Sequence, residues 1–156
     1  MRIATLAAAL VIAVTSAAIA HDYRIGSIEI EAPWTRAMPP GAKVGGGFMV
    51  ITNTGNEADR LIALTSPRAA RGEIHEMTMQ EGIMKMREVA GGLEIAPGES
   101  VELKPGGYHV MFMDVTEGFR EGERIPATLM FEKAGEITVE FVATGVGAKQ
   151  APAHMH

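Results

Sequence analysis

Residues 73–89 read EIHEMTMQEGIMKMREV. Two β-prone runs, 73–78 and 84–89, flank the turn-forming triplet Gln-Glu-Gly at 80–82. Strands joined by so short a connection run antiparallel and pair with each other. The stretch therefore predicts a β-hairpin, and it makes an antiparallel β fold the expectation for the whole chain.

Histidine and methionine alternate along both strands of this hairpin. His75, Met77 and Met79 are spaced by two residues, and so are Met84 and Met86 on the returning strand. Successive side chains of a strand point to opposite faces, so each of these sets occupies one face. A turn at the Gln-Glu-Gly triplet predicts a register that places His75 opposite Met86.

A third strand repeats the pattern farther along the chain. Residues 108–114 follow a Pro-Gly-Gly turn, and His109, Met111 and Met113 alternate within them. Two separate strands therefore each offer an imidazole beside thioethers on one face. For any single methionine, the alternative interpretation is that its side chain fills the core.

The rest of the chain has the same short-strand character. Apolar runs or apolar-polar alternation, bounded by Gly, Pro and Asn clusters, predict further strands at 28–31, 48–52, 61–64, 93–95, 101–103, 127–132 and 136–142. No window carries a helical stripe bounded by caps. Short strands separated by many of the 18 glycines and 8 prolines predict one all-β domain, an antiparallel sandwich or barrel.

The composition argues against several classes of function. The 156 residues carry a formal net charge of -5 and form no basic stripe, so nothing indicates a nucleic-acid partner. The chain has 11 methionines, 5 histidines and no cysteine. A blue-copper electron-transfer site requires a cysteine ligand, so the absence of cysteine argues against that class.

The first 20 residues, MRIATLAAALVIAVTSAAIA, have the features of a cleaved secretory signal peptide. Arg2 supplies the positive charge, residues 3–14 the apolar segment, and Ala18-Ile19-Ala20 a small-residue cleavage site. The apolar segment is short for a membrane span. We expect cleavage before His21, export to the periplasm and no stable membrane insertion afterwards.

The expected domain organisation of the mature chain is simple. Residues 21–144 are long enough to form one domain with its own core. Residues 145–156 are small, polar and Pro-containing, which predicts a flexible tail.

Imidazole and thioether ligands together favour Cu(I). This soft ion prefers polarizable sulfur and tolerates imidazole, and neutral ligands leave the site with a single positive charge. Magnesium and calcium need carboxylate or other oxygen ligands, and zinc prefers thiolates or more histidines. In an oxidising compartment a thioether also has the advantage that it cannot form a disulfide.

Several stretches of the chain resemble the PCu(A)C family of periplasmic copper chaperones. The motif in question is a histidine, a methionine after ten intervening residues, and a distant His-x-Met. The stretches that carry the resemblance are HEMTM at 75–79, MKM at 84–86, LKPGGYHVM at 103–111, APWTR at 32–36, PPGAKV at 39–44 and GLEI at 92–95. The resemblance covers roughly residues 23–143, and it implies a cupredoxin-like β-sandwich with a surface Cu(I) site.

The resemblance also implies which residues bind the metal. The two motif histidines fall on His75 and His109, and the motif methionines fall on Met86 and Met111. The segment between Met86 and His109 is one residue longer than in the family pattern. Met77 and Met84 therefore remain alternative ligands.

The resemblance further implies a role in the assembly of a respiratory oxidase. The acceptor would be a copper-bearing subunit of cytochrome oxidase, at its dinuclear CuA centre or another copper site. A Sco-type thioredoxin-like assembly protein would act as intermediary or reductant. The protein would then be a copper metallochaperone and not an enzyme.

The two ends of the mature chain offer further nitrogen donors. His154-Met155-His156 lies next to the terminal carboxylate, and nitrogen with oxygen donors suits Cu(II). Some members of the resembled family carry a His- and Met-rich extension of this kind. His21 would chelate Cu(II) through its ring and α-amine once the signal peptide is removed.

Two other functions use the same residues. Passive periplasmic copper buffering needs an identical ligand set, so the sequence does not separate it from delivery. A copper enzyme built on His21 is the more remote alternative, because it needs a second histidine beside the N-terminus. The only candidates, His75 and His109, already belong to the His-Met pattern.

Overall fold

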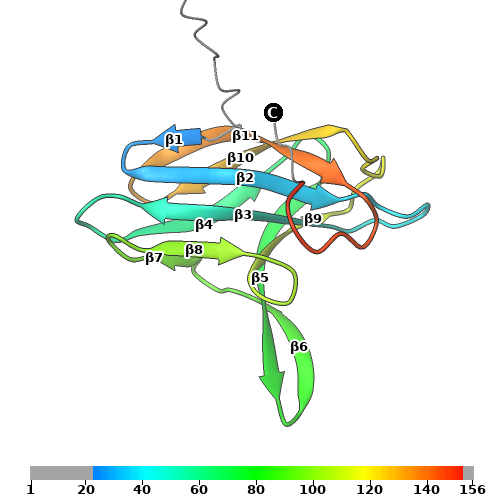
Figure 1. The fold of residues 1–156 in the computed structure, drawn as a ribbon, viewed down its shortest axis with the longest axis horizontal. Helices are drawn as coiled ribbons and strands as arrows, with labels where there is room; N and C mark the ends of the chain where they lie inside the picture. The colour runs from blue at the N-terminus through cyan, green and yellow to red at the C-terminus, as the bar shows by residue number, and fades with distance from the viewer. Residues whose placement is uncertain (1–22, 153–156) are drawn as a thin grey trace, which may run out of the picture.

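The computed structural model describes residues 23–152, and within them every regular element is a β-strand (Figure 1). The eleven strands are β1 Tyr23–Ile25, β2 Ile28–Arg36, β3 Gly45–Asn53, β4 Asp59–Thr65, β5 Arg71–Gln80, β6 Ile83–Glu88, β7 Leu93–Ile95, β8 Ser100–Leu103, β9 His109–Met113, β10 Arg124–Phe131 and β11 Gly135–Thr144. In this part of the chain there is no helix of the length and apolarity that a membrane span requires.

The strands form one mixed sheet that folds over on itself. Its order is β6-β5-β9-β3-β2-β11-β10-β4-β7, with β1 on β2 and β8 on β3. Gly72 of β5 lies against Leu64 of β4, so the two halves of the sheet meet and enclose the core. The all-β prediction is confirmed. The pairings are antiparallel except that of β11 with β2, where Val142 to Thr144 lie opposite Trp34 to Arg36 in parallel.

The strands expected from the sequence are present, and most extend beyond the expected bounds. The short strand β1 was not expected, because three residues are too few for alternation to be recognised in the sequence. Trp34 of β2 is 4% exposed, and its ring centroid lies 4.5 Å from that of Phe48 on β3.

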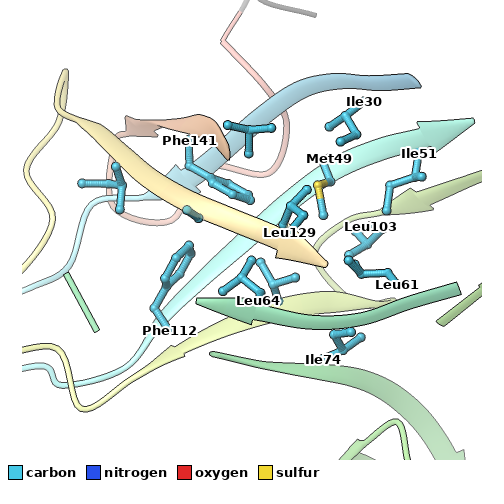
Figure 2. Close-up of a cluster of buried hydrophobic side chains, with 14 of the residues drawn as sticks. Ile30, Met49, Ile51, Leu61, Leu64, Ile74, Leu103, Phe112, Leu129 and Phe141 are labelled. Carbon is cyan, nitrogen blue, oxygen red and sulfur yellow. The ribbon is translucent and has the colours of Figure 1, made fainter. Parts of the chain in front are cut away.

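The core is a cluster of buried apolar side chains contributed by most of the strands, and Figure 2 shows part of it. Phe112 meets Phe119 and Phe141 edge to face, at centroid distances of 5.2 and 5.4 Å. Such edge-to-face contacts add to the gain from burying large aromatic rings. Ile74 and Val110 point into the same core, so their neighbours in sequence on β5 and β9 point out of it.

The hairpin of β5 and β6 projects away from the body of the sheet (Figure 1). The predicted register, with His75 opposite Met86, is wrong. Met77 lies opposite Met86, and His75 lies opposite Glu88. Part of the reason is that only Glu81 and Gly82 form the turn. Both have positive φ, of 51° and 78°, as a two-residue turn matched to the twist of a hairpin requires.

Candidate metal centre

The two histidines of the β-sheet lie side by side. His75 of β5 is the direct register partner of His109 of β9, and their ring centroids are 5.8 Å apart. Both side chains lie on the outer face of the sheet, because Ile74 and Val110 next to them point into the core. The sheet register therefore brings together two imidazoles that are separated by 33 intervening residues in the sequence.

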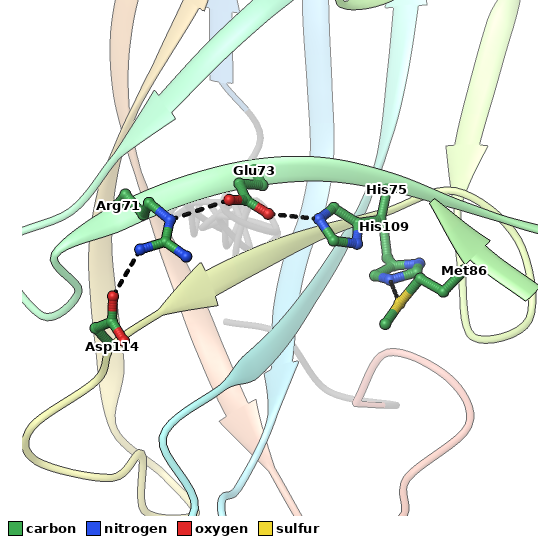
Figure 3. Close-up of polar contacts among 6 residues, drawn as sticks. All are labelled: Arg71, Glu73, His75, Met86, His109 and Asp114. Atoms are coloured by element: carbon green, nitrogen blue, oxygen red, sulfur yellow. Dashed lines mark hydrogen bonds and ion pairs between the residues drawn. The ribbon is translucent and has the colours of Figure 1, made fainter. Parts of the chain in front are cut away.

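His109 is held in a defined orientation. Its Nδ1 donates to the carbonyl of Gly107 at 3.1 Å, so Nε2 of the neutral ring carries the lone pair. That Nε2 lies 3.1 Å from the sulfur of Met86 (Figure 3). Burial lowers the pKa of His109, and the nearby His75 lowers it further, which favours the neutral ring. Two soft-metal donor atoms thus converge.

His75 has one nitrogen engaged and one free. Its Nε2 lies 2.7 Å from Oε2 of Glu73, whereas its Nδ1 is buried and has no hydrogen-bond partner among the described residues. A buried nitrogen without a partner is costly unless something else binds it. A metal ion at Nδ1 would satisfy this atom, so the ring fits a role as ligand.

Glu73 belongs to a chain of charged contacts that ends at His75 (Figure 3). Arg71 donates from Nε to Glu73 at 3.0 Å and from Nη1 to Asp114 at 2.8 Å. The hydrogen bonds from His75 and Arg71 hold the pKa of the Glu73 carboxyl below its usual range. Glu73 therefore stays an anion that orients the His75 ring.

Thioethers complete the surroundings of His109. Met77, Met86 and Met111 line an open pocket together with this ring, and Phe48 and other residues form its remaining wall. Among the nine methionines of the described part of the chain, only Met49 is fully buried in the core. The methionines of the site therefore do not fill the core.

The donor set suits a soft monovalent ion. It consists of imidazole nitrogen and thioether sulfur, all neutral, at a partly open surface. Within residues 23–152, no three or more His, Asp and Glu side chains gather at metal-binding distance. A carboxylate-rich site for a hard ion is thus not present in that part of the chain.

The structure describes six of the residues that the sequence predicted for the site. One pocket is lined by His109 and by three thioethers, those of Met77, Met86 and Met111. His75 lies beside His109. Four of these five residues are the ligands expected from the sequence, and Met77 is the alternative. Met84, the other alternative, lies two cross-strand pairs nearer the hairpin tip and does not line this pocket. The remaining candidates lie outside the described residues: His21, His154, Met155 and His156.

Glu73 was missed by the sequence prediction. A signal was available, because Glu73 is two residues before His75 and so shares its strand face. Its contact with the ring depends on side-chain conformation, which alternation alone does not specify.

For a centre that binds Cu(I), replacing Glu73 by glutamine is expected to weaken the binding by roughly tenfold, because a neutral amide orients the His75 ring less firmly. Competition against a chromogenic Cu(I) chelator measures this change. The matched control is Glu76→Gln, since Glu76 lies on the opposite face and accepts from Arg87 at 2.6 Å. Equal affinities for the two variants would show that the Glu73 contact does not position the ring.

The fold and the site together define a class: an all-β domain whose surface presents histidine and methionine to a soft metal. The profile of the family described as LpqE-like lipoproteins matches residues 28–143. The copper-bound PCuAC domain from PmoF2 is 30% identical, with a TM-score of 0.69 over 80% of this chain and 98% of that one. The chain belongs to this PCuAC, or LpqE-like, family, and its fold is cupredoxin-like.

Further relatives agree with this assignment. The apo PCuAC domain of PmoF2 is 29% identical with a TM-score of 0.69, over 84% of this chain and all of that one. Lipoprotein Lxx21020 of Leifsonia xyli subsp. xyli is 29% identical over 67% of this chain and 61% of its own length. The chain spans about three fifths of the length of the curated relatives it matches.

Proposed function

We propose that this protein is a copper chaperone that binds Cu(I) through His75, His109, Met86 and Met111. One observation carries the proposal: the lone pair of His109 Nε2 and the sulfur of Met86 converge at 3.1 Å, beside the partnerless Nδ1 of His75. The copper-bound form of the related PmoF2 domain supports copper as the metal. Met77 lines the same pocket and is the alternative thioether ligand.

Carriage of an ion requires that a partner can reach it. Met86 is 50% exposed on the projecting hairpin, whereas His109 is 7% exposed. An acceptor's ligands would displace the exposed thioether first and the buried imidazole last. Such stepwise exchange moves Cu(I) without a change of oxidation state and without catalysis by this chain.

The proposed setting is the periplasm, reached through the predicted signal peptide of residues 1–20. The lipoprotein-type relatives support export of this family. The proposed acceptor is a copper-bearing subunit of cytochrome oxidase, with a Sco-type thioredoxin-like protein as intermediary or reductant. His154, Met155 and His156 would add a Cu(II) site, and His21 would do so if it becomes the first residue.

Delivery is tested by mixing the Cu(I)-loaded protein with the apo CuA domain of an oxidase. Direct exchange predicts that copper arrives at a rate that rises with acceptor concentration. It also predicts faster arrival than from a small chelator that buffers Cu(I) at the same free concentration. Arrival no faster than from the chelator would favour passive buffering, which uses the same ligands.

A further inference from the structure

The hairpin beyond the histidine pair has two chemically different faces. Cross-strand pairing places Met77 opposite Met86 and Met79 opposite Met84, all four on the face that carries His75. The other face carries the charged and polar residues, among them the ion-paired Glu76 and Arg87. The methionines are thus segregated onto one side of a two-stranded ribbon. The residues of that polar face are Glu76, Thr78, Gln80, Lys85 and Arg87, with Ile83 beside them.

The methionines near the tip have no core to fill. Met79 is 63% exposed and Met84 is 47% exposed, on a hairpin that projects from the sheet (Figure 1). Packing therefore does not explain why both positions carry a long apolar side chain. Exposed apolar side chains gathered on one face usually mark a binding site.

The geometry of the tip suits a thioether site. Directly opposed residues of an antiparallel pair have Cβ atoms about 4.5 to 5.5 Å apart, within easy reach of two flexible methionine side chains. The next pair on the same face, Met77–Met86, lies two residues nearer the histidines. A third thioether is therefore within reach of the tip. Polarizable, neutral sulfur donors select soft monovalent ions.

We propose that Met79 and Met84 form a second soft-metal site at the hairpin tip, which takes Cu(I) or the chemically similar Ag(I). This site is distinct from the histidine-containing centre, and it rests on the proposed function only in that the cargo is the same ion. Two thioethers without an imidazole bind more weakly than the histidine centre. The tip site therefore fills after the histidine centre, and neither step transfers a proton or an electron.

The test follows each methionine separately. The full chain is labelled with methyl-13C methionine, and its methyl resonances are assigned by single Met→Leu variants. Cu(I) is added anaerobically up to three equivalents. The first equivalent is expected to shift the methyl of Met86, and the second is expected to shift those of Met79 and Met84.

The decisive variant is the double substitution Met79→Leu with Met84→Leu, which keeps size and apolarity but removes both sulfurs. It is expected to lose the second equivalent and keep the first. The matched control, Met130→Leu on β10, is expected to keep both. Unchanged Met79 and Met84 methyls through three equivalents, or a second equivalent retained by the double variant, would overturn the tip site. Failure of the proposed function has a different signature, because the Met86 and Met111 methyls would then stay unchanged.

Discussion

Replacing His109 by alanine is expected to abolish tight Cu(I) binding. The change removes the one nitrogen whose lone pair already faces a thioether sulfur, and it leaves Met86 without its partner. The expected loss of affinity exceeds the roughly 10- to 100-fold that the loss of an outer-shell partner costs. An anaerobic titration against a chromogenic chelator measures it, with one tight equivalent expected for the unaltered protein.

Two controls make this result specific to the site. Met130→Leu removes a sulfur far from the histidines and is expected to keep the tight equivalent. Truncation after Gly147 is also expected to keep it, since the proposed Cu(I) ligands precede that residue. Tight binding that survives His109→Ala would contradict the proposed centre, and tight binding lost on truncation would move the Cu(I) site to the tail.

Replacing Gly72 by alanine is expected to destabilise the fold by about 3 kcal/mol or more, because the added Cβ would overpack the contact with the backbone of β4. A Cβ at Gly72 would lie 2.4 Å from the carbonyl oxygen of Leu64 and 2.3 Å from its Cδ2. A backbone carbonyl cannot move aside as a side chain can, so β4 and β5 would have to separate. Urea unfolding measures the change in free energy.

The control for this prediction is Gly118→Ala. A Cβ at Gly118 would meet only Met38 at an ordinary 3.6 Å, so a change within about 0.5 kcal/mol is expected. Equal stability of the Gly72 and Gly118 variants would mean that β4 and β5 do not approach each other as closely as described. A destabilised Gly72 variant is also expected to misplace His75, which follows three residues later on β5.

The sequence was sufficient to predict ten of the eleven strands and the shared face of the histidines and methionines. Side chains alternate between the two faces of a strand, so residues two apart share a face. This rule alone places His75 and His109 each on the same face as their neighbouring methionines. The direct pairing of these two residues was not predicted, because it depends on how β5 and β9 align across 33 residues of chain.

The hairpin register was mispredicted for a local reason. The triplet Gln-Glu-Gly contains one turn residue more than the structure uses, and Gln80 pairs with Ile83 instead of entering the turn. A three-residue turn would place His75 opposite Arg87, so this accounts for one of the two residues by which the predicted register was wrong. A two-residue turn requires Glu81 at positive φ, a conformation in which Asn, Asp or Gly is usual and glutamate is not. The sequence therefore does not indicate that the turn is this short. The parallel contact of β11 with β2 has no local signal either, since it joins opposite ends of the domain.

The parallel pairing of β11 with β2 places the end of β11 beside the pocket that contains His109. Thr144 ends the strand opposite Arg36, whose Nε donates to the Ala148 carbonyl at 2.6 Å, and Arg36 is part of the pocket wall. A fusion partner, an affinity handle or a dye at that end would start from the rim of the metal site and compete for the space of an incoming acceptor. Tyr23 lies opposite Ile30, six residues back along β2, or roughly 20 Å at the rise of a strand. The N-terminal side is therefore the better place for a tether.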